Sequence, residues 1–322
     1  MGEFLLEIEG LQKYFYSPGS LFSRTRSVVR AVEDVRIGIR RGETLGLVGE
    51  SGCGKSTLGR LIMRLEEPTA GTIRFSGEEI VFFHGEALKG YRRKVQMIFQ
   101  DPCSSLNPRQ TAATIIGEPL LIHRRKDPRQ NRDRIAESMT VVGLSREQMN
   151  RYPHEFSGGQ RQRIGIARAL ILQPELIVAD EPVSSLDVSI QAQILNLMKR
   201  LQREYGLTYL FIAHDLGVVR HMSDRIAVMY LGRIVEIAPA DVLCERPLHP
   251  YTQALISAIP VLDPSARRSR TELQGEILSR ISPLAGCPFY SRCLRSDGDC
   301  QRMVPVLKDV GNAHWVACHK II

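Results

Sequence analysis

Apolar positions along the chain follow two different spacings, and each spacing predicts one kind of element. Short apolar or alternating runs predict strands, which cover residues 4–9, 28–40, 43–49, 72–75, 95–99, 174–180 and 207–214. Apolar residues three and four positions apart predict helices, which cover residues 55–65, most of 111–172, 188–204 and 215–222. Residues 225–230 and 232–237 are typical of a closing hairpin. The alternation of strands and helices predicts an α/β fold.

The pattern weakens towards the end of the chain. After about residue 260 the regular periodicity fades, and Pro, Gly, Ser and Arg become more frequent. We therefore expect a domain boundary ahead of this tail. No segment repeats another, so the chain carries one copy of its fold.

Composition and charge narrow the class of protein. A chain of 322 residues with 43% apolar and 24% charged residues suits one large globular domain plus an appendage. The net charge of +8 is scattered, with short clusters at Arg92–Lys94, Arg124–Lys126 and Arg267–Arg270, so we expect no nucleic-acid partner. There is no run of eighteen apolar residues, and Met1–Gly10 lacks the basic start of a signal peptide. These features indicate a cytosolic chain, where stable disulfides are disfavoured.

A phosphate-binding motif stands between a predicted strand and a predicted helix. GESGCGKST, Gly49–Thr57, matches G-x-x-x-x-G-K-[ST] in the context that this motif requires. Its glycines let backbone N–H groups surround phosphates, while Lys55 can reach the β- and γ-phosphates and the Ser56 hydroxyl suits Mg²⁺. Cys53 inside the loop is interpreted as a small filler, with a reactive thiol as the alternative.

Two adjacent carboxylates end a later apolar strand. In LIVADEP, Asp180 stands where this class of protein holds Mg²⁺ with a carboxylate, and Glu181 can polarise the attacking water. Together with the phosphate loop, they predict a nucleoside triphosphatase.

A further motif indicates which kind of triphosphatase this is. FSGGQRQRIGIARAL, Phe156–Leu170, places Ser-Gly-Gly-Gln at the start of an amphipathic helix, which provides a second anion-binding helix end. Two such ends in one chain suggest that ATP lies between two chains. The segment resembles the signature motif of ATP-binding cassette (ABC) proteins. Gln100 then resembles the family's Q-loop glutamine, SSLD at Ser184–Asp187 its D-loop, and His214 its switch histidine.

An aromatic segment near the N-terminus also resembles an element of ABC proteins. Tyr14, Phe15 and Tyr16 match the segment that stacks on adenine. Phe15 best fits the family's spacing after Lys13, with Tyr14 and Tyr16 as alternatives.

The resemblance implies a role for each matching residue. Glu181 would act as the base towards water, and His214 would contact the γ-phosphate. Ser56, Gln100 and Asp180 would surround Mg²⁺. The residues implied to contact ATP are Phe15, Gly49, Ser51, Gly52, Cys53, Gly54, Lys55, Ser56, Thr57, Gln100, Ser157, Gly158, Gly159, Gln160 and Asp187. The signature residues and Asp187 would meet the ATP held by the opposite chain, so hydrolysis is expected to need a dimer.

The resemblance also implies an architecture. ABC nucleotide-binding domains combine a RecA-like core with an antiparallel β subdomain and a helical subdomain. We place the ABC ATPase domain at residues 1–245, its helical subdomain at about 101–172, and a small irregular C-terminal extension at 246–322.

Three more segments resemble the ATPases of dipeptide and oligopeptide importers: residues 99–109, 246–260 and 273–293. This resemblance implies an ATP-hydrolysing subunit that energises peptide import with two permease subunits and an extracytoplasmic substrate-binding protein. It implies a peripheral place on the cytoplasmic face of the cell membrane, beside a second ABC ATPase subunit, with a heterodimer favoured over a homodimer. Selection of the substrate would lie in the other subunits.

The alternative is a non-transport ABC ATPase that acts on ribosomes, on DNA or in Fe–S assembly. A single cassette and compact spacing between the motifs argue against it.

Four of the seven cysteines lie in the last 36 residues: Cys287, Cys293, Cys300 and Cys318. They lack the paired knuckles typical of zinc sites, and four thiolates suit an iron–sulfur cluster. Tails of peptide-importer ATPases resemble this one in carrying four cysteines around a [4Fe–4S] cluster. We expect such a cluster to staple the tail, with zinc and then free thiols as alternatives. His314 and His319 are interpreted as surface residues, with replacement of one cysteine ligand as the alternative.

Overall fold

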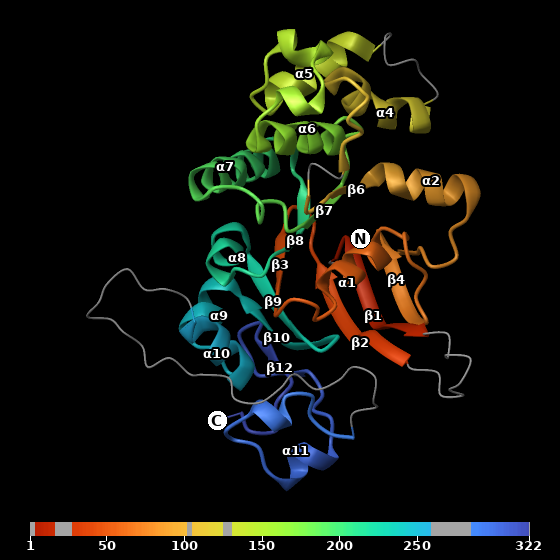
Figure 1. Cartoon of the computed structure of the whole chain (residues 1–322). Helices are drawn as coiled ribbons and strands as arrows, with labels where there is room; N and C mark the ends of the chain where they lie inside the picture. Colours follow the sequence, from red (N-terminus) through yellow and green to blue (C-terminus); the bar gives the residue numbers. More distant parts are fainter. Residues whose placement is uncertain (1–3, 17–27, 102–104, 125–130, 259–284, 322) are drawn as a thin grey trace, which may run out of the picture. The chain divides into compact units, whose positions relative to one another are not determined.

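The computed structural model describes residues 4–16, 28–101, 105–124, 131–258 and 285–321 (Figure 1). The chain divides into two compact units. The first unit consists of Met1–Gly38, Thr44–Val81 and Ala213–Ile322. The second unit consists of Ile39–Glu43 and Phe82–Ile212. Parts of three predicted segments, at residues 102–104, 125–126 and 259–284, lie outside the described residues. In the part of the chain that is described, no helix is long and apolar enough to cross a membrane.

One sheet of the first unit has four strands, in the order β2-β1-β4-β5. These strands are β1 (Leu6–Tyr16), β2 (Val28–Ile39), β4 (Ala70–Phe75) and β5 (Glu78–Glu79). Leu6 and Ile8 of β1 lie opposite Phe75 and Ile73 of β4, and all four side chains are buried. Apolar side chains at every second position thus form one covered face. This sheet is the antiparallel β subdomain that the ABC resemblance implied.

The other strands of the first unit include two short strands from the C-terminal tail. They are β3 (Thr44–Val48), β9 (Arg225–Tyr230), β10 (Arg233–Pro239), β11 (Lys308–Asp309) and β12 (Trp315–Val316). β3 is parallel to β9, whereas β9, β10 and β12 pair antiparallel in turn, as the predicted hairpin requires. The helical elements of this unit are α1 (Lys55–Ile62), α8 (Leu216–Met222), α9 (Ala240–Glu245), α10 (Pro250–Ser257), the 3₁₀ turn η5 (Tyr290–Arg292) and α11 (Gly298–Arg302).

The second unit has a parallel sheet, formed by β6 (Val95–Ile98), β7 (Leu176–Asp180) and β8 (Thr208–Ile212). Every residue of β7 and β8 is buried, which explains their unbroken apolar sequences. The helical elements are α2 (Gly85–Lys94), α4 (Ala112–Arg124), α5 (Arg132–Val141), η2 (Arg146–Asn150), η3 (Pro153–Glu155), α6 (Gly158–Leu170) and α7 (Val188–Tyr205).

Helices α4, α5 and α6 pack against one another and form the helical subdomain (Figure 1). Helix α2 was not predicted, because Tyr91 is its only buried residue and its sequence has no apolar stripe. The α/β class and the ABC architecture are confirmed. The proposed boundary at residues 245 and 246 stays a prediction.

Candidate functional site

The phosphate loop in the first unit connects β3 to α1, and its glycines have backbone angles that other residues avoid. Gly52 and Gly54 have φ values of +74° and +114°, and Gly54 is the N-cap of α1. No described side chain caps this helix start. The first turn therefore presents its backbone N–H groups without a competing side-chain oxygen, as binding of a phosphate requires.

Lys55 lies folded over the loop. Its Nζ donates to the backbone oxygens of Gly49, at 2.7 Å, and Glu50, at 3.1 Å, and only 4% of the residue is exposed. Ser56 and Thr57 follow in the first turn of α1 and are half-buried, whereas Ser51 is exposed. The loop backbone, a buried ammonium and a hydroxyl thus lie within nine residues, and this donor set fits a nucleotide phosphate with Mg²⁺.

Cys53 is buried within this loop, with 3% of the residue exposed. Its backbone oxygen accepts from the Gly232 N–H at 2.8 Å, and its Sγ lies 3.9 Å from the Lys55 Nζ. Burial supports the interpretation as a small filler.

The aromatic segment lies at the end of β1. The Tyr14 hydroxyl donates to Glu33 Oε1 at 2.9 Å, and the Arg30 guanidinium lies 5.3 Å from the centre of the Tyr14 ring. Phe15 is 40% exposed and Tyr16 60%. Tyr14 is therefore half-buried and held by Glu33 and Arg30, whereas Phe15 and Tyr16 are exposed; which of the three stacks on adenine stays a prediction.

The carboxylates at the end of β7 belong to the second unit. Asp180 is buried, and Glu181 follows it with a φ of +46°, a strained value for a side-chain-bearing residue. The Glu181 N–H donates to the backbone oxygen of Ile212 at 2.9 Å, which helps to hold this conformation. Gln100 Nε2 donates to Glu181 Oε2 at 3.0 Å. The structure thus places Gln100 beside Glu181, two residues that the sequence analysis proposed from separate motifs.

The signature segment begins α6 of the same unit. Ser157 is the N-cap: its Oγ accepts from the Gln160 N–H at 3.4 Å, and its own N–H donates to Gln160 Oε1 at 3.0 Å. Gly159 is buried and Gly158 half-buried. Asp187 is exposed at the N-cap of α7, and His214, in the first unit, is exposed after β8. Each unit therefore carries part of the predicted set.

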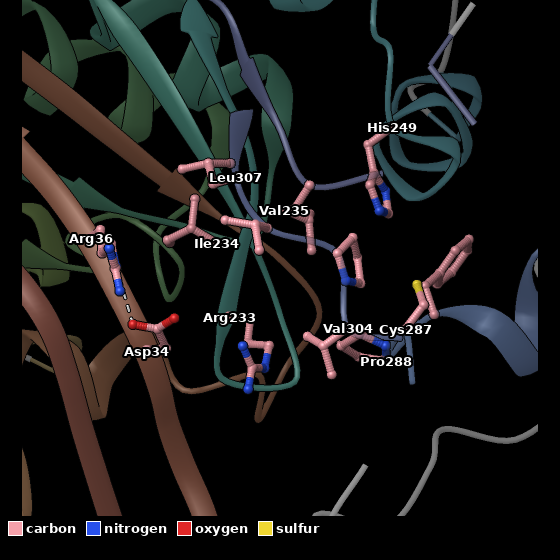
Figure 2. A pocket seen from close by; sticks show the side chains of 14 residues that line it. Asp34, Arg36, Arg233, Ile234, Val235, His249, Cys287, Pro288, Val304 and Leu307 are labelled. Atoms are coloured by element: carbon pink, nitrogen blue, oxygen red, sulfur yellow. Dashed lines mark hydrogen bonds and ion pairs between the residues drawn. The ribbon is translucent and has the colours of Figure 1, made fainter. Parts of the chain in front are cut away.

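The prediction of a [4Fe–4S] cluster, or of zinc, in the C-terminal tail is wrong. Among the residues described, no group of three or more His, Cys, Asp or Glu side chains could hold a metal ion. Cys287 lines a largely apolar cavity of about 280 Å³ (Figure 2), and burial raises the pKa of its thiol to about 11.

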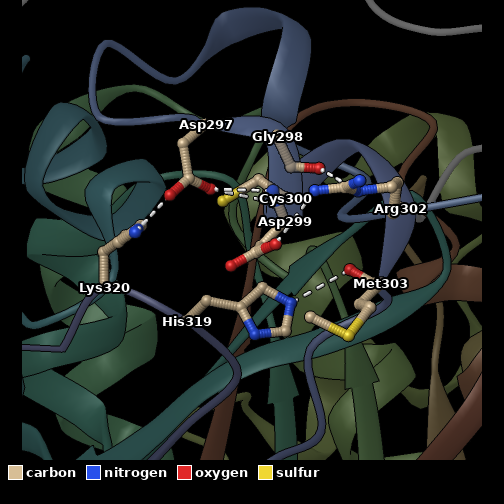
Figure 3. Close-up of polar contacts among 8 residues, drawn as sticks. All are labelled: Asp297, Gly298, Asp299, Cys300, Arg302, Met303, His319 and Lys320. Atoms are coloured by element: carbon tan, nitrogen blue, oxygen red, sulfur yellow. Dashed lines mark hydrogen bonds and ion pairs between the residues drawn. The ribbon is translucent and has the colours of Figure 1, made fainter.

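Cys300 has a different environment, in the first turn of α11. The Asp297 carboxylate caps this helix by accepting from the Asp299 N–H at 3.1 Å and from the Cys300 N–H at 3.2 Å (Figure 3). Lys320 pairs with Asp297 and, together with these N–H groups, holds the pKa of Asp297 well below its usual range. Side-chain and backbone contacts therefore order this turn.

A buried carboxylate takes over the stapling that the metal was expected to provide. Glu236 of β10 is fully buried and accepts from the backbone N–H of Leu248, at 2.7 Å, and of His249, at 3.1 Å. Its Oε1 also lies 2.7 Å from His314 Nε2. His314 is thus a buried hydrogen-bond partner of Glu236, and its assignment to the surface was wrong. His319 is exposed as predicted.

Comparison with known proteins places this geometry among transport ATPases. Residues 32–184 match the ABC transporter family, and residues 235–300 match the family described as "Oligopeptide/dipeptide transporter, C-terminal region". The oligopeptide transport ATP-binding protein AppF of Bacillus subtilis (strain 168) is 52% identical over 320 residues, which are 98% of this chain and 97% of AppF. The dipeptide transport ATP-binding protein DppF of Escherichia coli (strain K12) is 49% identical over 317 residues, which are 98% of this chain and 94% of DppF.

Solved structures agree with this placement. The ATP-binding cassette MJ0796 bound to ADP and Pi, described as dimeric, has a TM-score of 0.64 and 29% identity, and the match covers 73% of this chain and 98% of that one. This likeness defines the class as ABC ATPase. The near-full-length identity to AppF and DppF then narrows it: the chain belongs to the family of ATP-binding proteins of oligopeptide and dipeptide ABC transporters.

Proposed function

We propose that this chain is the ATP-hydrolysing subunit that energises peptide import across a membrane, together with permease subunits and a substrate-binding protein. The observation that carries the proposal is the union of two parts in one chain. One is an intact phosphate loop with a downstream Asp180–Glu181 pair. The other is the C-terminal region, which matches the oligopeptide/dipeptide transporter family. The relatives named above are transport proteins, so the non-transport alternative is not favoured.

The residues of the first unit bind and orient the nucleotide. ATP supplies the phosphoanhydride bond whose hydrolysis releases the free energy for transport. The loop Gly49–Thr57, through its N–H groups and Lys55, holds the phosphates, and Ser56 offers a hydroxyl to Mg²⁺. Phe15 packs on adenine, and His214 contacts the γ-phosphate.

The residues of the second unit handle the metal and the proton. Asp180 and Gln100 would help to hold Mg²⁺, which would neutralise charge on the phosphates. Glu181 takes the proton of the attacking water, and its hydrogen bond to Gln100 Nε2 fixes the orientation of the carboxylate. The strained backbone of Glu181 supports this role, because such strain collects at functional residues.

The signature residues serve a second ATPase chain. Ser157, Gly158, Gly159 and Gln160 approach the ATP of the opposite chain, and Asp187 crosses the interface. The dimeric form of the solved cassette MJ0796 supports a paired arrangement. We favour a heterodimer at the cytoplasmic face of the membrane, with residues 246–322 as a distinct extension.

The test reconstitutes the chain with its permeases and binding protein in lipid vesicles, and measures ATP turnover and uptake of labelled di- and oligopeptides. Lys55→Ala should lose ATP binding. Glu181→Gln should keep ATP binding but hydrolyse ATP about a hundredfold more slowly or worse. Both variants should lose uptake, whereas the control Lys94→Ala, at an exposed position of α2, should match the wild type. Peptide that fails to stimulate turnover, alongside co-sedimentation with ribosomes, would overturn the assignment.

A further inference from the structure

The phosphate loop is held from outside by the C-terminal extension. Its second residue, Glu50, forms a two-pronged ion pair with Arg292 of η5: Nη1 lies 2.8 Å from Glu50 Oε2, and Nη2 lies 3.0 Å from Oε1. The backbone N–H of Glu50 donates to the Tyr251 hydroxyl of α10 at 2.8 Å. Two residues of the extension thus bind the side chain and the backbone of one loop residue.

Arg292 and Tyr251 are shielded from water, and Glu50 is partly shielded. Arg292 is 7% exposed at its side chain, Glu50 26%, and Tyr251 is fully buried. Paired, planar Arg–carboxylate contacts of this kind are short, directional and hard to replace. The Glu50 carboxylate accordingly raises the pKa of Arg292 above its usual value.

An aromatic cluster fixes the direction of the guanidinium. Arg292 Nη1 donates to the Tyr230 hydroxyl at 3.4 Å, and the Phe289 ring packs edge-on against the Tyr230 ring with centroids 5.2 Å apart. Tyr251 packs on both of these rings, at 4.6 Å and 5.5 Å. The clamp therefore connects β9, α10 and the tail with the loop.

The loop is clamped on two sides. Lys55 binds the backbone oxygens of Gly49 and Glu50 from within, and the extension binds Glu50 from outside. The position of this peptide segment sets where the Lys55 ammonium lies. In addition, an unpaired Glu50 carboxylate would place a negative charge beside a site built for phosphates.

We propose that Arg292 and Tyr251 are positioning residues of the nucleotide site, which act through Glu50, so that the C-terminal extension is required for full ATP affinity. This inference rests on the proposed function, because it assumes that the loop binds ATP. It assigns the C-terminal extension a role in nucleotide binding.

The test measures binding of a fluorescent MgATP analogue to the full-length chain and ATP turnover in the assembled transporter. Arg292→Gln should weaken MgATP binding about tenfold, because it leaves the Glu50 charge uncompensated. Glu50→Gln and the double variant Glu50→Gln/Arg292→Gln should each weaken MgATP binding only about threefold, because both lose the paired contact but neither leaves an uncompensated Glu50 charge. Arg292→Lys should lie between, since it keeps the charge but loses the paired geometry.

Arg302→Gln is the matched control, because it also removes a tail arginine from an ion pair, with Asp299 at 3.3 Å (Figure 3). It should bind MgATP like the wild type. Tyr251→Phe should weaken binding about threefold through loss of the acceptor for the Glu50 N–H. Tyr209→Phe, which loses a buried hydroxyl of β8, should not change it.

A merely structural pair predicts a different pattern. Glu50→Gln and Arg292→Gln would then be equally harmful, and the double variant would rescue nothing. That pattern, or unchanged affinity in a folded Arg292→Gln variant with wild-type circular dichroism, overturns the inference. Lys55→Ala in the same assay distinguishes failure of the proposed function from failure of the positioning role. If Lys55→Ala binds MgATP normally, the proposed function fails. If Lys55→Ala loses binding but Arg292→Gln binds like the wild type, only the positioning role fails.

Discussion

Helices α1 and α6 both begin at a glycine-bearing motif proposed to meet phosphate, yet their first turns differ. Gly54 caps α1 through its left-handed backbone, and none of the side chains in the described ranges caps that end. Ser157 and Gln160 cap α6 through a reciprocal pair of hydrogen bonds. A capping box satisfies N–H groups that an uncapped start leaves for a ligand.

The difference separates two kinds of helix end. The start of α1 is arranged for an anion by the chain itself, with help from the extension. The start of α6 is already capped without a ligand, so in the proposed arrangement a phosphate from a second chain would share or replace the Ser157 cap. ATP binding should therefore depend on the first helix end in a single chain, and turnover on both ends in the assembled pair.

The largest effect should come from adding a methyl group in each of the two motifs, at the first residue of the phosphate loop and in the first turn of α6. In Gly49→Ala the new Cβ would lie 2.1 Å from the backbone oxygen of Met229, which cannot turn away, so MgATP binding should weaken about a hundredfold or more. In Gly159→Ala it would lie 2.5 Å from the Ile190 Cγ2, which can move. That variant should lose about 1–3 kcal/mol of unfolding free energy but keep single-chain ATP binding.

Nucleotide titration and chemical denaturation of both variants check this pair. Equal loss of single-chain ATP binding in the two variants would show that the helix ends are not independent.

Removal of the α6 cap should have the next largest effect. Ser157→Ala should lower the unfolding free energy by about 1 kcal/mol, and turnover in the assembled transporter should fall about tenfold or more, while single-chain MgATP binding stays unchanged. Ser145→Ala is the control, because Ser145 forms the same capping box with Gln148 at η2. It should cost similar stability without any loss of turnover. Equal turnover in both variants contradicts a ligand-facing role for α6.

Low pH should destabilise the contacts that support the phosphate loop before α1 and should not affect the cap of α6. His249 Nδ1 accepts from the Tyr251 N–H at 3.1 Å, and burial lowers the pKa of His249 to about 4. The unfolded chain binds this proton already near pH 6.5, so stability is full above that pH and falls as the pH drops towards 4, by on the order of 3 kcal/mol.

Denaturant titrations between pH 7.5 and 4.5 measure the slope of unfolding free energy against pH. MgATP binding should weaken over the same pH range. His249→Asn keeps an acceptor for the helix cap and should flatten the slope. The exposed His84→Asn should leave it as in the wild type. A slope that survives in His249→Asn would assign the acid sensitivity to other groups.

The smallest effect should come from the thiol inside the phosphate loop. Cys53→Ala should change MgATP affinity within about twofold, because the buried side chain fills space. Peroxide treatment should inhibit wild type and variant equally. Protection of turnover by the substitution would instead make Cys53 a redox-sensitive group.

Local patterns predicted the parts of this protein that depend on neighbouring residues. The glycines around Lys55, the apolar run ending at Asp180 and the Ser157 helix start each need only a short segment to be recognised. Most strands and helices ahead of residue 240 followed from periodicity, whereas α2 and the short elements after that residue did not. The resemblance to peptide-importer ATPases carried the architecture and the transport class. The residue roles themselves stay predictions.

Long-range contacts were beyond those patterns. Glu50 and Arg292 are 242 positions apart, and neither stands in a periodic run that signals a partner. His314 was assigned to the surface because nothing near it shows that Glu236 lies buried opposite. The cysteines misled for the same reason: their number and spacing do not show whether the fold arranges them as ligands, and among the described residues no such group could hold a metal ion.

The Glu50–Arg292 contact also determines when, during synthesis of the chain, the phosphate loop receives its outer support. A ribosome adds about 5–20 residues per second, so roughly 10–50 s pass between synthesis of the loop and synthesis of its outer clamp. During that interval the nascent chain carries a phosphate loop whose Glu50 charge is still unpaired. Nearly finished chains, and fragments that end before residue 292, should therefore compete poorly for ATP with the completed protein.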